Sequence, residues 1–236
     1  MKRPLATVVA LAVAGALLAT IGTFVYIQFV KEDAPDRLTL DAGTADGTTA
    51  DDDPTAATAR AQASELAGVW KVTTGSQAGY RVKEVLFGQS AEAVGRTSSV
   101  TGEMQFDGTT LRTASFSVDM TTMASDESRR DNQFRGRIMD TATHPTADFT
   151  LSSPIPIGEL PAEGQEIAVA AKGKLALRGT TKLVTIPLTA QRAAGNIRVA
   201  GNLTIVFDEW GIPNPSFGPA ETEDRGELEF LLVLTR

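Results

Sequence analysis

The sequence predicts an all-β domain, an antiparallel sandwich or barrel with one helix, behind a single N-terminal transmembrane helix and a disordered tether. Three observations lead to this prediction. Residues 5–30 carry no charge, residues 31–66 are acidic and lack apolar periodicity, and residues 67–236 show short apolar alternations between turn signals. The chain of 236 residues is long enough for one sizeable domain besides the first two segments.

Residues 1–30 are predicted to be a retained membrane anchor. The 26 uncharged residues 5–30 would measure about 39 Å as a helix, more than the roughly 30 Å of a bilayer's hydrocarbon core. A cleaved signal peptide is the alternative, because Ala14-Gly15-Ala16 offers a small-residue cleavage pattern, but cleavage there would leave a long apolar start. Lys2 and Arg3 favour a cytoplasmic N-terminus. We therefore expect a single-pass protein of the cell membrane with an extracytoplasmic C-terminal domain.

Residues 31–66 are predicted to be an acidic, disordered tether. They contain nine acidic and three basic residues, and their composition cannot bury enough apolar surface to offset the entropy of ordering. The run Asp51-Asp52-Asp53 lacks the spacing of a calcium loop and is interpreted as solvated charge. The net charge of −7 also argues against a nucleic-acid partner, because such proteins need clustered Lys and Arg.

Residues 67–236 are predicted to form the folded β domain. Apolar and polar residues alternate in the run 116–121, and Ile167, Val169 and Ala171 occupy alternate positions in a second run, as expected for strands with one buried face. The last run, 228–234, is apolar on both faces. Asp107-Gly108 indicates a hairpin turn, because this pair tolerates positive φ.

One segment, 125–139, has the features of a helix instead. Ser125 or Asp126 can cap its start, and Phe134 and Ile138, four residues apart, share one helical face. We expect this helix to lie between strands and to cover one end of a barrel.

The sequence offers little for catalysis. It has no cysteine and a single histidine, His144, and it lacks a G-x-S-x-G turn, a phosphate-binding glycine loop and the spacing of a zinc site. We therefore expect no enzyme activity, no metal and no cofactor. Arg129 and Arg130 have two interpretations: they face an anionic lipid head group at the barrel mouth, or they belong to a charge cluster on the helix surface.

Three motifs follow one another in the folded region: SRRDNQF at 128–134 with HP and ADF after it, KGKLALRGTTKLVTIPL at 172–188, and FDEWGI at 207–212. They resemble the Arg-Asp helix, the signature hairpin and the Asp-x-Phe-Gly-Ile segment of the YceI family of polyisoprenoid-binding, lipocalin-like proteins. Arg178 stands where the family often has His, and Trp210 where Phe is usual. The resemblance implies an eight-stranded antiparallel lipocalin-like barrel with a hydrophobic tunnel for an isoprenoid chain, and no catalytic residues.

We therefore expect membrane-anchored binding of an apolar lipid, a polyisoprenoid or isoprenoid quinone, for storage or transport in the cell envelope. The expected cavity residues are Phe116, Val118, Met120, Phe134, Ile138, Phe149 and Leu151, with Arg129 and Arg130 for head-group contact. The expected partners are this lipid and the membrane, and a homodimer is left open. The alternative is a packed barrel that acts through its outer surface as a structural or protein-interaction module. An enzyme acting on a lipid head group would need a convergent polar cluster at the mouth.

Overall fold

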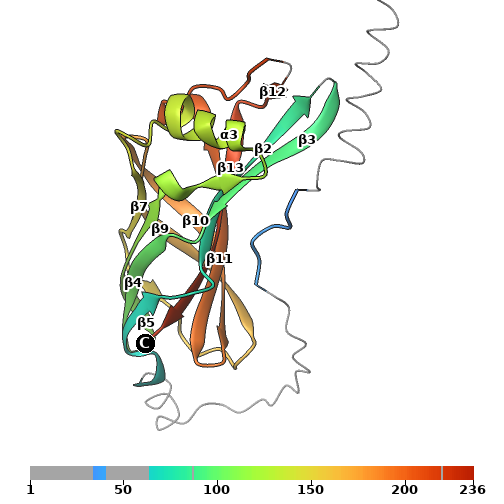
Figure 1. Ribbon diagram of the computed structural model, residues 1–236. Coiled ribbons are helices and arrows are strands. Elements are labelled where there is room, and N and C mark those ends of the chain that lie inside the picture. The colour runs from blue at the N-terminus through green and yellow to red at the C-terminus, as the bar shows by residue number, and fades with distance from the viewer. Residues whose placement is uncertain (1–33, 41–63, 87, 219) are drawn as a thin grey trace, which may run out of the picture.

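The protein is described by a computed structural model that places residues 34–40, 64–86, 88–218 and 220–236 (Figure 1). The predicted membrane span and most of the predicted tether lie outside these residues. Within the described part of the chain, no helix combines the length and apolar character needed to cross a bilayer.

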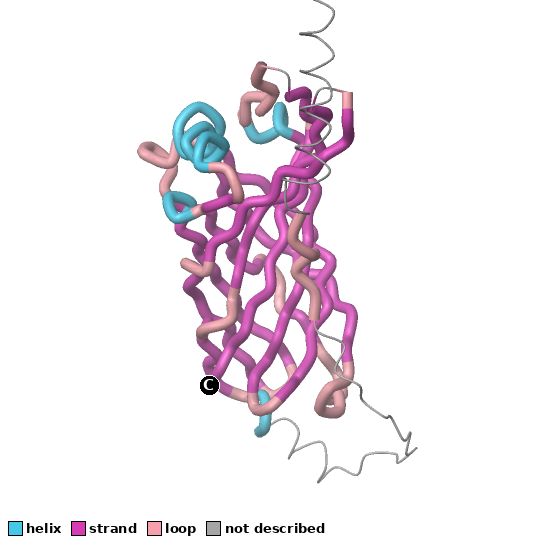
Figure 2. The backbone as a smooth tube through the Cα atoms, turned by 45° about the vertical axis from the view of Figure 1, so that its right-hand side comes forward, coloured by secondary structure: helices cyan, strands magenta, loops and turns pink. Residues whose placement is uncertain are grey.

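The described domain is built from antiparallel strands, with most of the short helical segments at one end and a helical turn over residues 64–66 at the other (Figure 2). The strands are β1 (Gly68–Val72), β2 (Gln77–Leu86), β3 (Gln89–Thr97), β4 (Val100–Asp107), β5 (Thr110–Asp119), β6 (Ala124–Ser125), β7 (Thr146–Leu151), β8 (Ile155–Pro156), β9 (Glu166–Leu177), β10 (Thr180–Ala193), β11 (Asn196–Val206), β12 (Ala220–Thr222) and β13 (Arg225–Thr235). The helical segments are η2 (Met120–Thr122), α3 (Ser128–Gln133), η3 (Phe134–Ile138) and η4 (Phe207–Trp210).

Eight of these strands close into a barrel, in the order β1, β4, β5, β7, β9, β10, β11 and β13, because β1 pairs with both β4 and β13. The eight-stranded antiparallel barrel expected from the sequence is thereby confirmed. β13 also pairs with a second strand on the same edge: its lower part meets β1 at Leu234↔Val72, and its upper part meets β2 at Leu228↔Tyr80. The hairpin of β2 and β3 therefore widens the wall at the upper end, where β6 and β12 add to it.

The strands alternate between the barrel interior and solvent, as their sequence pattern predicts. On β9, Lys172 and Lys174 are exposed while Gly173 and Leu175 are buried. β9 and β10 are joined by a tight turn in which Arg178 and its neighbour Gly179 both take positive φ, which suits the twist of a two-residue hairpin. The predicted hairpin turn at Asp107-Gly108 is also present, between β4 and β5.

The helix expected over 125–139 is shorter and less regular than predicted. Ser125 belongs to β6, and the N-cap of α3 is Glu127, whose carboxylate accepts a hydrogen bond from the Arg129 amide at 3.0 Å. The following turn, η3, is a π-helical turn in which Phe134 and Ile138 are both buried. Ser125 instead uses its backbone amide to bond Asp131 on α3, at 2.8 Å, so the predicted first turn becomes a link between the sheet and the helix.

The buried apolar residues form two clusters, one in each half of the barrel. The lower cluster closes one end with Leu66, Trp70, Phe106 and Leu234, and the Trp70 indole donates a hydrogen bond to the Leu66 carbonyl at 2.8 Å. The upper cluster lies under α3, η3 and η4 and includes the buried Trp210.

The lower cluster depends on Leu234, which is 0% exposed. We expect Leu234→Ala to lower the free energy of unfolding by about 2–5 kcal/mol, because it removes buried methyl groups and leaves a cavity. The same change at Leu183, which is 58% exposed, is expected to stay within about 0.5 kcal/mol. Denaturant unfolding followed by tryptophan fluorescence compares the two variants, and similar losses at both positions would contradict the packing described.

Candidate functional site

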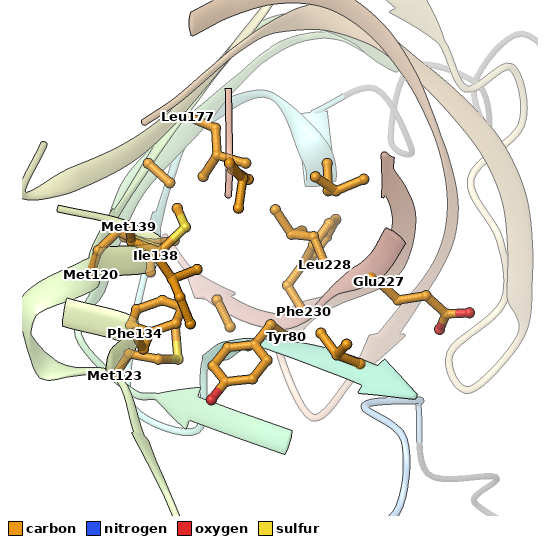
Figure 3. A pocket seen from close by; sticks show the side chains of 18 of the residues that line it. Tyr80, Met120, Met123, Phe134, Ile138, Met139, Leu177, Glu227, Leu228 and Phe230 are labelled. Carbon is orange, nitrogen blue, oxygen red and sulfur yellow. The ribbon is translucent and has the colours of Figure 1, made fainter. Parts of the chain in front are cut away.

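A cavity of about 600 Å³ lies inside the barrel, and most residues of the two apolar clusters line it (Figure 3). Its wall is apolar over most of its depth. The deeper part of this wall is formed by Met104, Leu111, Ala114, Ala171, Leu188, Val199, Phe230 and Leu232. Leu66, Trp70, Phe106 and Leu234 do not line it, because they close the lower end beneath it. The cavity is therefore a blind apolar tunnel that opens at the α3 end.

All seven residues expected to face an interior cavity line this one. Phe116 and Val118 come from β5, Phe149 and Leu151 from β7, and Met120, Phe134 and Ile138 from the segment that includes η2 and η3. Phe116, Val118, Phe149 and Leu151 were predicted from strand alternation, and Phe134 and Ile138 from their spacing of four residues on a helical face. That they contact a ligand stays a prediction.

Sequence reasoning missed the lining residues contributed by the other strands of the wall, which are β2, β3, β4, β9, β10, β11, β12 and β13. On β2, Tyr80 and Val82 point into the cavity together with Glu84, and this alternation was readable in the sequence. On β13 the lining residues Leu228 and Phe230 alternate with Glu227 and Glu229, so the first half of the strand carried a readable signal. The apolar Leu231 and Val233 on the other face obscured it in the second half.

The cavity stays open because large rings lie against glycines of the neighbouring strands. Phe230 stands opposite Gly201, where a Cβ would lie 2.7 Å from its Cζ, and Phe116 stands opposite Gly102, where a Cβ would lie 2.6 Å from its Cδ1. Such contacts are closer than side chains allow, so only glycine admits these rings against the wall. The rings cover the backbone rather than fill the centre of the barrel.

The mouth of the cavity lies between α3 and the segment that precedes β12. Phe217, which is 50% exposed, lines the mouth, and the Arg129 guanidinium lies 5.1 Å from the centre of its ring. Arg137 of η3 donates hydrogen bonds to the carbonyls of Asn214 and Pro215, at 3.0 and 3.1 Å. Two arginines therefore connect the helical side of the mouth with the opposite loop.

Arg130 also lines the mouth, but it is engaged with carboxylates. Its Nη2 lies 3.5 Å from the Glu84 carboxylate on the cavity wall, and its Nη1 pairs with Asp126. Burial lowers the pKa of Arg130, but Asp126 and Glu84 outweigh it, and the pKa is raised. Asp131 accepts hydrogen bonds from Ser125 instead of pairing with an arginine. Of the two predicted head-group arginines, Arg129 is the one that contacts an exposed ring at the opening.

Tyr80 lines the cavity with its phenol ring. Its ring stacks on Phe134 with the centroids 4.9 Å apart and the planes 12° from parallel (Figure 3). Burial raises the pKa of its hydroxyl well above the usual value of about 10. The hydroxyl therefore stays protonated at the upper end of the cavity.

His144 and Trp210 lie away from the cavity lining. The His144 ring packs on the β9–β10 turn, where a Cβ on Gly179 would lie 2.7 Å from its Cε1. Trp210 is buried in the upper cluster, and its carbonyl accepts a hydrogen bond from Thr180 at 3.3 Å. Among the described residues, no three His, Cys, Asp or Glu side chains are grouped so that they could hold a metal ion.

The closed end, the apolar tunnel and the short helix beside its mouth define a lipocalin-like barrel. The sequence profile of the YceI-like domain matches residues 70–234. The chain therefore belongs to the YceI-like family.

The chain is similar to several solved structures. A polyisoprenoid-binding domain from Saccharophagus degradans, implicated in plant cell wall breakdown, has 17% identity and a TM-score of 0.59, over 71% of this chain and 97% of that one. BcnA of Burkholderia cenocepacia has 21% identity and a TM-score of 0.49, over 65% of this chain and 95% of that one. The YceI protein of Campylobacter jejuni has 14% identity and a TM-score of 0.43, over 57% and 82%. A search of curated protein sequences gave no match.

The raised pKa of Tyr80 predicts a pH dependence of stability. The unfolded chain releases the phenol proton above about pH 10 while the folded barrel keeps it, so folding loses up to about 1.4 kcal/mol per pH unit above that value. Tyr80→Phe removes this contribution. We expect the free energy of unfolding of the wild type to fall more steeply than that of the variant between pH 10 and 11, approximately the window set by the phenol. Parallel curves would contradict the burial of this hydroxyl.

Proposed function

We propose that the barrel binds one apolar lipid chain, a polyisoprenoid or the tail of an isoprenoid quinone, for storage or transport in the cell envelope. The observation that carries this proposal is the blind apolar cavity of about 600 Å³. Residues 5–30 anchor the protein in the cell membrane, with the barrel on the extracytoplasmic side. No chemical step is assigned to the site, and the barrel acts as a binding protein.

The size of the cavity suits a chain of intermediate length. At about 30 Å³ for a water-sized group, it has room for about 20 such groups, comparable with about 20 carbon atoms. At about 0.8 kcal/mol for each buried CH₂, this chain gains on the order of 16 kcal/mol, against roughly 4–15 kcal/mol for the lost freedom of association. A longer lipid would leave its remaining carbons at the mouth.

A branched chain suits the wall better than a straight one. The lining includes the small side chains of Ala78, Ala93, Ala114, Ala147 and Ala171 between larger apolar groups. These positions leave recesses for the methyl branches of an isoprenoid. The likeness in fold to a polyisoprenoid-binding domain supports the same class of ligand.

The polar end of the lipid would lie at the mouth, next to Arg129 and Arg130. Because Arg130 is paired with Glu84 and Asp126, its charge is largely balanced. Arg129, which contacts Phe217, is the better placed of the two for a phosphate or a quinone oxygen. The alternative of a packed barrel that acts only through its outer surface is less well supported, because the centre of this barrel is open.

Lipid analysis tests the proposal directly. The full chain is purified in a mild detergent from its host membrane, and its extracted lipids are measured by mass spectrometry. We expect one isoprenoid or quinone per chain, retained through washing because the cavity has a single opening. An empty barrel that also fails to take up added isoprenoid would overturn the proposal.

A cavity-filling variant tests the location. Ala171 is buried and points into the cavity, whereas its neighbour Ala170 on the same strand is exposed. We expect Ala171→Phe to lose most of the bound lipid, because the added ring occupies the tunnel, and Ala170→Phe to retain it. The lipid-to-protein ratio of each purified variant is the measurement. Equal ratios in two folded variants would place the lipid elsewhere.

A further inference from the structure

Residues 34–40, expected to be part of a disordered tether, lie instead along the outside of the barrel (Figure 1, blue). The Pro35 carbonyl accepts a hydrogen bond from Arg81 of β2 at 2.6 Å, and the Asp36 carbonyl accepts one from Arg96 of β3. Arg37 pairs with Glu227 of β13, and Leu40 is only 7% exposed. We call this segment the strap.

The strap covers a charge cluster that the outer face of a barrel rarely contains. The Glu229 side chain, 3% exposed, lies between two arginines, 2.9 Å from Arg96 and 3.6 Å from Arg81. Arg81 also bonds Glu92 at 2.6 Å. Buried charges of this kind are stable only when their polar groups have partners. The carbonyls of the strap supply two of these partners.

The charges of the surface and the strap are complementary. The strap carries one cation, Arg37, and one anion, Asp36, so its own net charge is zero. Arg37 pairs with Glu227, which has no other arginine among its ion pairs in the described residues, and the backbone carbonyls of Pro35 and Asp36 accept hydrogen bonds from Arg81 and Arg96. The surface therefore holds the strap through specific pairs and not through a difference in net charge.

The strap runs along the barrel from the mouth towards the closed end. β2 runs from the closed end towards β12, and Arg81, which holds Pro35, lies nearer the mouth than Gly79, which pairs with Arg96. The chain therefore reaches the barrel from the mouth side. From residue 30 to Pro35 an extended chain spans at most about 18 Å.

The barrel itself begins at the opposite end. Trp70 of β1, with Leu66 before it, belongs to the cluster that closes the bottom of the barrel. Without the strap, a tether through residues 31–66 would attach the domain by its closed end. The strap reverses this, because it brings the chain back to the mouth.

The mouth carries exposed apolar side chains and an arginine, which are side chains that suit contact with a lipid surface. Phe217 and Val85 are 50% and 41% exposed, and both flank β12: Val85 pairs with Glu221, and Phe217 bridges to Ala220. Arg129 lies over the Phe217 ring. Aromatic rings and arginines of this kind favour the interface of a bilayer with anionic lipids.

We propose that the strap holds the mouth of the barrel against the outer leaflet of the bilayer that contains residues 5–30, so that lipid passes between membrane and cavity without crossing water. This inference rests on the anchoring and lipid binding proposed above. It assigns Phe217, Val85 and Arg129 to membrane contact, and residues 34–40 to the orientation of the domain.

Because the chain has no cysteine, single cysteines can report this orientation in the full-length protein. Glu221→Cys marks the mouth, and Ala194→Cys marks the β10–β11 turn at the closed end, roughly 35 Å away for strands of this length and tilt. Each carries a bimane label in vesicles of phosphatidylcholine and phosphatidylglycerol that contain a head-group nitroxide lipid. We expect several-fold stronger quenching at position 221 than at 194. Equal quenching, or stronger quenching at 194, would overturn the orientation.

A matched pair of variants tests the strap. Residues 34–40 are replaced by seven Gly and Ser residues, and in the control the same replacement is made at 44–50. We expect the first variant to lose the difference in quenching and the control to keep it. Arg37→Glu is a milder second variant that should reduce the difference, and adding Glu227→Arg should restore it. A difference that persists in both strap variants would show that the strap does not orient the barrel.

Flotation and lipid content, measured on the same samples, separate this inference from the proposed function. A chain that does not float with the vesicles overturns the anchor and the orientation together. A floating chain that retains its isoprenoid but shows equal quenching at both labels overturns the orientation alone.

Discussion

One edge of β13 is shared by two strands, and the shape of the molecule follows from this. At Leu234 the partner is β1, which closes the ring of eight strands tightly around the lower apolar cluster. At Leu228 the partner is β2, which leads into a longer hairpin and widens the wall. Because a single strand cannot serve both positions, the barrel narrows to a closed end and opens at the other. The short helical segments cover the open end, and the cavity has one mouth.

The interior could have been filled by side chains, as in many small barrels, and local pairing explains why it is not. Phe116 and Phe230 lie against Gly102 and Gly201 on adjacent strands, so these rings line the lumen. The resulting wall is apolar and its small residues leave recesses between larger ones. Because side chains do not fill the centre, an apolar ligand can gain free energy by burying its surface there. An apolar chain is therefore the ligand proposed.

The outer face has its own constraint in the Glu229 carboxylate, which is nearly inaccessible although it lies outside the lumen. A buried carboxylate requires cations, and Arg81 and Arg96 require further acceptors in turn. Residues 34–40 supply two of these acceptors with their carbonyls, and Arg37 pairs with Glu227. Charged residues of β2, β3 and β13 thus hold the strap along the part of the barrel wall that leads to the mouth of the cavity. In the arrangement proposed, the strap orients the barrel so that the mouth of its cavity faces the membrane.

The sequence by itself determined which side of most strands faces inward, because side chains alternate with a period of two. Phe116, Val118, Phe149 and Leu151 all line the cavity, the hairpin at Asp107-Gly108 is present, and three motifs were enough to indicate the YceI family. In the second half of β13 alternation gave no orientation, because Leu231 and Val233 are apolar as well as Leu232 and Leu234. Only the tertiary structure decided the double pairing of β13, the π-helical turn of η3 and the docking of residues 34–40. These depend on partners far apart in the chain, as Pro35 is from Arg81 and Asp36 from Arg96, and no local pattern specifies which distant groups meet.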